Sequence, residues 1–357
     1  MKFRNLKFLT VVILLLQVHW SFSQTWTNNS VLSSGDWYKL SLDATGVYKI
    51  SPSFIATNNI GDGSSINIDE IRIYGNGVGI LPANSSIFRK DDLQEIPVKR
   101  VDVNQNGIFD GSDYILFYAK GPHEWKKASN SNDFGHTINF YRDVNFYFIT
   151  VGNGQGKEIQ SASLNSGIPT NTVISYDDFQ FKEDESDNLV GAGRTWVGDL
   201  FDFTLQYNYG FNFPDLDLTQ PVKVRVNAVA RASTGNTRMK VNISSLPIDT
   251  LTFSAHGTIQ GASYVSGALG KSQFLPNGDN FSVSLIYDNS QNPSGVAWLD
   301  YIEIQARRQL FWRANSLGFR DINSVGIGNL SQFKISNANS AVEIWDVTDI
   351  NKTFSIY

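Results

Sequence analysis

The chain has 357 residues, of which 41% are hydrophobic, 13% aromatic and 18% charged. This balance is typical of a folded globular protein and excludes a largely disordered chain, and at about 150 residues per domain the length predicts about two domains. The net charge of −5 argues against a nucleic-acid partner, because phosphate binding needs an excess of Lys and Arg. The sequence contains no cysteine, which excludes disulfides, thiolate metal sites and cysteine nucleophiles.

Residues 1–23 have the pattern of a secretory signal peptide. Basic residues open the segment, an apolar run over residues 8–16 follows, and the small residues Ser21 and Ser23 precede Gln24. The apolar run is far shorter than the ~20 residues needed to span a bilayer, which argues against a membrane anchor. We therefore predict an exported protein whose mature chain starts near Gln24 and has no transmembrane helix.

Beyond this segment, short alternating stretches are interrupted at close intervals by Gly, Asn and Asp, which is typical of a β protein. Over residues 24–160 we predict an N-terminal β domain that opens with a hairpin turning at Asp43–Gly46, followed by a brief helix capped at Ser51–Pro52. The further strands predicted in this domain are 70–74, 96–101, 113–118 and 145–151. The segment 114–118 is apolar on both faces, which favours a central position in its sheet.

Residues 161–188 are rich in Ser, Asn and acidic side chains, and we predict a linker or long loop there. A β-sandwich domain is predicted over residues 189–310, where residues 222–230 alternate between apolar and polar side chains as in a half-buried strand. Residues 311–357 are predicted to form closing strands. The expected fold class is all-β, with two antiparallel β units, the second a jelly-roll-like β-sandwich, and minimal helix.

One loop in the first domain has the spacing of a calcium-binding loop. Counting from its first aspartate, oxygen-bearing side chains occur at loop positions 1, 3, 5, 9 and 12, with Gly107 at position 6. The candidate metal ligands are Asp102, Asn104, Asn106, the carbonyl of Ile108, Asp110 and Asp113. Side chains at this spacing can converge on a hard cation such as Ca²⁺. The flanking segments are predicted strands and not the helices of an EF-hand, so a metal-free turn closed by Asn and Asp side chains is the alternative.

No other motif predicts a catalytic or cofactor site. The sequence has no Gly-x-Ser-x-Gly motif, so it lacks the usual signature of a serine hydrolase of the α/β class. The histidines beyond the signal peptide do not have the i, i+4 spacing of a helical zinc site; they are His123, His136 and His256. Three tryptophans are candidates for stacking on sugar rings, although core packing is the simpler account in a β protein; they are Trp125, Trp196 and Trp312.

Several segments, taken together and in order, resemble one protein family. They are Trp37-Tyr-Lys-Leu40, Thr45-Gly-Val-Tyr-Lys-Ile50, Ile71-Arg-Ile-Tyr-Gly-Asn-Gly77, Asp113-Tyr-Ile-Leu-Phe-Tyr-Ala119 with Gly121-Pro122, and Trp298-Leu-Asp-Tyr-Ile-Glu303 with Arg307-Arg308. Over essentially the whole mature chain, the sequence resembles the amino-terminal, non-catalytic region of the PorU family. These are the gingipain-like surface peptidases, or sortases, of the Bacteroidetes type IX secretion system.

The resemblance implies that a cysteine peptidase removes the carboxy-terminal signal of exported cargo at the outer membrane. In the family the catalytic domain follows a segment resembling residues 342–349, so residues 311–357 would lead toward a peptidase domain that the printed sequence does not include. The chain would then be a fragment, the product of a truncated gene or a stand-alone relative, and not itself an enzyme.

The function that the resemblance implies for this chain is that of a scaffold or docking region. Its partners would be the peptidase domain, outer-membrane secretion components and exported cargo proteins. Its location would be the cell surface or outer membrane, with the periplasm as the alternative. The alternative function is a stand-alone surface carbohydrate-binding or adhesin module, and a second alternative is a peptidase in its own right.

Overall fold

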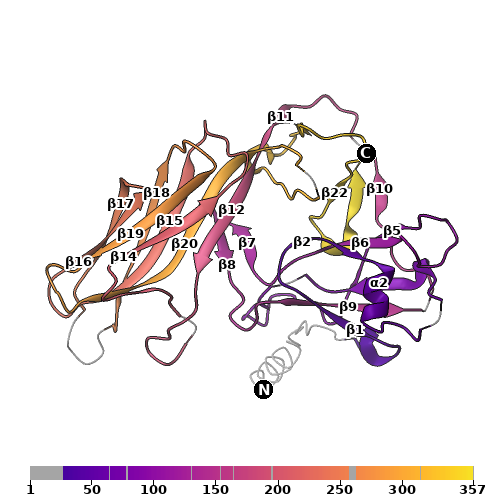
Figure 1. The fold of residues 1–357 in the computed structure, drawn as a ribbon, viewed down its shortest axis with the longest axis horizontal. Coiled ribbons are helices and arrows are strands. Elements are labelled where there is room, and N and C mark those ends of the chain that lie inside the picture. Colours follow the sequence, from indigo (N-terminus) through magenta and orange to yellow (C-terminus); the bar gives the residue numbers. More distant parts are fainter. Residues whose placement is uncertain are drawn as a thin grey trace, which may run out of the picture.

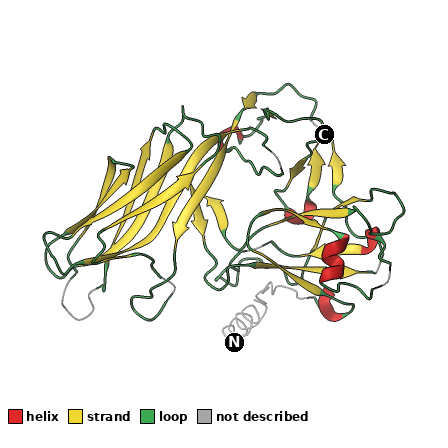
Figure 2. Ribbon diagram, viewed as in Figure 1, coloured by secondary structure: helices red, strands yellow, loops and turns green. Residues whose placement is uncertain are grey.

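The computed structural model describes residues 27–356 except residues 64, 78, 130, 153, 164, 194, 195, 257–262 and 314. The predicted signal peptide, residues 1–23, lies outside the described residues. The chain folds into an N-terminal β unit and a β-sandwich, with a two-stranded hairpin between them (Figure 1, Figure 2). Strands dominate and helix is minimal, so the predicted all-β class is confirmed. In the part of the chain that the structure describes, no helix is long and apolar enough to cross a membrane.

Two small antiparallel sheets that share one core form the N-terminal unit. The first has the order β1-β9-β3-β4 and consists of β1 (Tyr38–Leu42), β9 (Asn145–Val151), β3 (Ile71–Tyr74) and β4 (Glu95–Ile96). The second has the order β2-β6-β5 and consists of β2 (Gly46–Ile50), β6 (Tyr114–Ala119) and β5 (Lys99–Val101). Fully buried isoleucines from both sheets, such as Ile73, Ile115 and Ile149, fill the core. Strand β6 has the central position that its apolar sequence predicted.

The hairpin predicted at the start of this unit is wrong. Strand β1 pairs with β9 and β2 pairs with β6, so the turn at residues 43–45 carries the chain from one sheet to the other. Leu42 and Ile50 both contribute to the shared core, which favours this arrangement over direct pairing of β1 with β2. The predicted strand 96–101 is split in the same way, because Pro97 cannot donate to a ladder and the chain changes sheets there.

Helical segments are short. Helix α2 (Pro52–Thr57) begins as predicted, since the Ser51 side chain accepts the N–H of Phe54 and a proline occupies the first turn. The 3₁₀ segments are η1 (Val31–Ser33), η2 (Ile68–Glu70), η3 (Ile322–Ser324) and η4 (Ile350–Lys352).

The second unit is a sandwich of two antiparallel sheets. One has the order β12-β20-β15-β18 and consists of β12 (Ser175–Glu183), β20 (Val296–Gln309), β15 (Val222–Arg231) and β18 (Ser266–Phe274), with β13 (Leu200–Phe201) also on β20. The other has the order β14-β19-β16-β17 and consists of β14 (Gln206–Asn212), β19 (Asn280–Asp288), β16 (Thr237–Ile243) and β17 (Leu246–Phe253). The first strand of the sandwich, β12, lies beside the last, β20. Likewise β14 lies beside β19, and this nesting is the strand order of a jelly roll.

The prediction of a linker or long loop over residues 161–188 is wrong for much of that range. It contains β11 (Asn171–Val173) and all of β12, and β10 (Gln160–Ala162) ends in it. Strand β12 pairs with β20 along its whole length. Its charged side chains conceal the strand in the sequence because they have partners in the fold, as Asp178 does with Arg308.

The closing strands predicted within residues 311–357 are present, but they pair with the segment that precedes the sandwich. They are β21 (Ser331–Phe333), β22 (Ile344–Asp346) and β23 (Phe354–Ile356). Strand β21 is parallel to β11, and β23 lies between β10, to which it is parallel, and β22. Ile350 is buried in the core of the N-terminal unit, so the end of the chain returns to that unit (Figure 1).

Candidate functional site

The predicted calcium loop lies between β5 and β6 and is closed by its own hydrogen bonds. Asp113, at its end, is 2% exposed, and its two carboxylate oxygens accept the N–H groups of Val103 and Asp110 at 2.8 and 3.0 Å. Asp102 accepts the N–H of Gly107 at 2.7 Å through Oδ2, whereas its Oδ1 is buried without a hydrogen bond. Gly107 has a φ of 78°, which is the turn that the sequence predicted.

The asparagines of the loop bind its central aspartate. The side-chain amides of Asn104 and Asn106 each donate to Asp110 at 3.1 Å, and the Asn106 oxygen accepts the N–H of Ile108 at 2.7 Å. These bonds are those of the metal-free turn described above. The carboxylates that fit a hard cation are nevertheless present, with one oxygen of Asp102 left without a donor. Calcium binding at this loop stays a prediction.

A second cluster of charged groups lies where a hairpin of β7 (Glu124–Lys127) and β8 (Phe134–Thr137) covers the outer face of the sandwich. Trp125 and Phe134 pack on Phe179 of β12. Their ring centroids lie 4.8 Å and 4.6 Å, respectively, from the centroid of the Phe179 ring. Gln305 of β20 accepts the N–H of Phe134 at 3.1 Å and donates to the carbonyl of the same residue. The first sandwich sheet is therefore covered on both faces. We call the contact of β7 and β8 with β12 and β20 the joint, and this contact connects the two units.

His136 of β8 is the charged centre of the joint. Its Nδ1 lies 2.6 Å from Oε1 of Glu303, and its Nε2 contacts Oε2 of Glu183. The side chains of His136, Glu183 and Glu303 are only 3%, 8% and 2% exposed. Because both ring nitrogens face carboxylate oxygens, both must carry hydrogen, and the imidazole is the protonated cation. Arg225 of β15 adds a second cation, with its Nη1 2.6 Å from Oε2 of Glu303.

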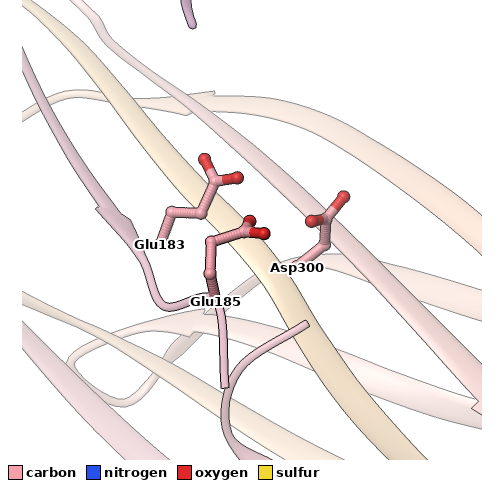
Figure 3. A group of neighbouring side chains, drawn as sticks. All are labelled: Glu183, Glu185 and Asp300. Carbon is pink, nitrogen blue, oxygen red and sulfur yellow. The ribbon is translucent and has the colours of Figure 1, made fainter. Parts of the chain in front are cut away.

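Beside His136, the carboxylates of Glu183, Glu185 and Asp300 lie within 4.8 Å of one another and point into the same space (Figure 3). Glu183 ends β12 and Glu185 follows it. Asp300 is the extra residue of a β-bulge in β20, where the register against β15 shifts next to Asn227. A bulge re-aims a side chain, and here Asn227 donates to the aspartate that the bulge turns toward the glutamates.

The crowding of these groups changes their proton affinities. Burial raises the pKa of Glu185 to about 7, and the hydrogen bond and charge of Glu183 add to the effect. Burial and the charge of Glu183 raise the pKa of Asp300 to about 6. For His136, burial acts to lower the pKa, but the hydrogen bonds and charges of Glu183 and Glu303 outweigh it and raise the pKa to about 9.

Sequence reasoning did not find this cluster. The acidic run 182–187 is visible in the sequence, but its composition predicts part of a linker, and His136 has no partner nearby in the sequence. Trp125, a candidate for sugar stacking, instead packs on Phe179 in the joint. The only signal that could have helped was the alternation of Phe179, Phe181 and Glu183.

Comparison with known proteins adds a likeness of the whole fold. No family model and no curated protein matches the sequence. The solved structure of dimeric latent PorU from Porphyromonas gingivalis superposes with a TM-score of 0.76 over 92% of this chain, at 19% sequence identity. The chain has the fold of a PorU region. The resemblance noted in the sequence is thus confirmed at the level of the fold, and the chain spans 30% of the length of the solved PorU chain.

Other solved structures match only in part. A carbohydrate-binding module, CBM36 in complex with calcium and xylotriose, matches with a TM-score of 0.21 and 13% identity, over 28% of this chain and 71% of that module. A CBM36-1 domain of a xylanase from the hindgut metagenome of Trinervitermes trinervoides matches with a TM-score of 0.20 and 14% identity, over 31% of this chain and 73% of that one. Likenesses at these TM-scores do not inform the function of this chain.

Proposed function

We propose that this chain is a non-catalytic scaffold that docks and positions a gingipain-like peptidase domain of a type IX secretion system at the outer membrane. The observation that carries the proposal is the fold shared with PorU over nearly all of this chain and about a third of that one. The exported cargo, the secretion components and the cell-surface location belong to the same proposal.

The residues of the chain support a structural role. Cysteine peptidase chemistry needs a thiolate and a histidine, and the printed sequence contains no cysteine. His136, the most perturbed histidine among the described residues, is held between two carboxylates as a cation and cannot act as a base while so paired. The joint then serves to hold two β units in a defined relation, which is what a scaffold requires.

The carboxy-terminal segment offers a surface for the docked domain. Ile168, Val325 and Ile327 are 91%, 75% and 109% exposed, and hydrogen bonds between Thr170 and Leu330 hold their two loops together. Three exposed apolar side chains on adjoining loops are typical of a contact surface. The partner that the proposal assigns to them is the peptidase domain.

Isothermal titration calorimetry tests the proposal. The chain from Gln24 onward is titrated with a separately produced gingipain-like peptidase domain of the PorU kind. We expect specific binding that Ile327→Glu weakens at least tenfold. The matched control is Phe203→Glu, which places the same charge on a side chain that is 99% exposed on the sandwich and should leave the affinity unchanged. Absence of binding by the folded chain contradicts the proposal.

A further inference from the structure

We propose that the joint is a proton-responsive clamp, in which protons bound at Glu185 and Asp300 favour docking of the β7–β8 hairpin on the sandwich, and their loss loosens it. The proposal is independent of the partner that the chain binds. It rests on the geometry of the joint, where carboxylates of the sandwich meet a histidine of the hairpin.

The charges at the joint do not balance when every acid is ionised. From the sandwich, Glu183, Glu185, Asp300 and Glu303 face the joint, together with the phenol of Tyr301 and the cation of Arg225. Among the described residues of the N-terminal side, only His136 pairs with them, and the ring of His123 lies against Phe181. The nearby charges form separate ion pairs away from the cluster. These pairs are Lys182 with Asp184, Lys223 with Asp133, and Lys126 with Glu124. The four acids at the centre therefore face two cations.

The hairpin side helps to bury the acids that have no basic partner. A cavity of about 230 Å³ borders the cluster, and Thr137, Ile138 and Phe140, at and after the end of β8, form one wall of it. On the sandwich side Glu185 and Asp300 lie in the same cavity wall as Trp196. Docking of the hairpin thus removes water from two carboxyl groups that lie beside the carboxylate group of Glu183.

Linkage gives the direction of the response. Burial, together with the charge of Glu183, raises the pKa of Glu185 from its ordinary 4.5 to about 7 and that of Asp300 from 3.8 to about 6; docking of the hairpin supplies part of this burial, and the charge of His136 offsets part of the shift at Asp300. A closed joint therefore binds more protons than an open one, and closing becomes less favourable as the pH rises through this range. His136 acts in the same direction, because its pKa of about 9 in the closed joint means that closing stabilises the cation. The stabilisation that these protons give the closed joint is fully present below about pH 3.8, the ordinary pKa of Asp300, and is lost in steps as the pH rises through about 6, 7 and 9.

A bound proton fits this cluster better than a bound metal ion. One carboxylate oxygen of Glu183, Oε2, contacts the protonated His136, and Arg225 pairs with the adjoining Glu303. Two fixed cations next to the acids repel a divalent ion, whereas a shared proton needs no further space.

The test uses the absence of native cysteine from the chain. Cysteines introduced at two exposed positions, Ala56→Cys on α2 and Thr252→Cys on β17, accept a donor and an acceptor dye, and single-molecule energy transfer reports the relation of the two units. We expect one narrow distribution at about pH 5.5 and a second, broader population at about pH 8.5, with a midpoint between the pKa values of Asp300 and Glu185.

Three variants make the test specific. Glu185→Gln and Asp300→Asn each remove one titrating group while keeping its shape, and each should retain the closed population at about pH 8.5. Asp202→Asn, which changes an exposed carboxylate elsewhere on the sandwich, should behave as the unmodified chain. If one cluster variant fails to fold by circular dichroism, the other decides.

Two results would overturn the clamp. One is an energy-transfer distribution of the unmodified chain that stays the same over the pH range. A pH response of Glu185→Gln and Asp300→Asn as large as that of the unmodified chain would count equally against the clamp. The other is a pH response that differs between millimolar calcium and chelator, because the cluster would then respond to a cation and not to protons.

Discussion

Two acidic clusters of this molecule differ in how their charges are stabilised. In the loop of residues 102–113, Asp102 and Asp113 accept backbone N–H groups of their own loop. In the joint, Glu183, Glu185 and Asp300 come from two segments more than a hundred residues apart, and their environment depends on His136 of the hairpin. The first cluster is local and the second is tertiary.

This difference predicts opposite responses to solution conditions. Carboxylates bonded by N–H groups are stabilised as anions, and a cation can add to that arrangement. Carboxyl groups buried beside another carboxylate are stabilised when protonated. The loop should therefore respond to calcium, and the joint should respond to pH.

The largest effect should come from His136→Gln. The substitution leaves Glu183 and Glu303 buried without their shared cation, and breaking such a buried pair typically costs about 3–5 kcal/mol. The free energy of unfolding in urea measures the loss. The control is Arg313→Gln, which breaks an ion pair of an exposed arginine with Asp215 and should have little effect. A His136→Gln chain as stable as the control would show that the joint is not held by this histidine.

Calcium should have the next largest effect, through the loop of residues 102–113. A ligand bound only by the folded chain stabilises it by about 2.7 kcal/mol at a hundredfold excess over Kd, so calcium should raise the melting temperature and chelator should lower it. Asp102→Ala should abolish the difference, and Asp202→Asn should preserve it. Identical melting of the unmodified chain in millimolar calcium and in chelator would identify the loop as a metal-free turn.

A smaller effect is expected from Glu185→Gln on stability at alkaline pH. The pKa of Glu185 is raised to about 7 in the folded chain, so its contribution to stability is present below about pH 4.5 and lost as the pH rises through 7. Because the group is partly exposed, the gain of the variant at about pH 8.5 should be of the order of 1 kcal/mol, with no gain at about pH 5. Urea unfolding at the two pH values measures it, and an equal change at both would point to packing instead of titration.

No effect is expected on peptide turnover. The chain from Gln24 onward should not cleave peptides that mimic carboxy-terminal secretion signals, and thiol-alkylating reagents should label nothing, because the printed sequence offers no thiolate. High-performance liquid chromatography of the peptide after incubation checks this. Turnover that survives repurification and follows the folded chain would contradict the scaffold proposal.

The sequence by itself determined the features that depend on near neighbours. Alternation in residues 222–230 predicted β15, because a strand's two faces are encoded at a period of two, and the short run 114–118, apolar on both faces, predicted β6 as a central strand. Ser51 and Pro52 predicted the start of α2 for an equally local reason. The turn at Gly107 and the spacing of its acidic neighbours were visible because all of them lie in one loop.

Only the tertiary structure decided which strands are neighbours and which charges meet. The alternation of β1 and β2 suits a hairpin as well as two separate sheets, and the shared core selects the second. The charges of β12 indicated a solvated loop in the sequence, whereas in the fold they face Arg308 and His136. Without a known partner, a charged side chain is predicted to be exposed to solvent. Here the partners lie up to 130 residues away in the sequence.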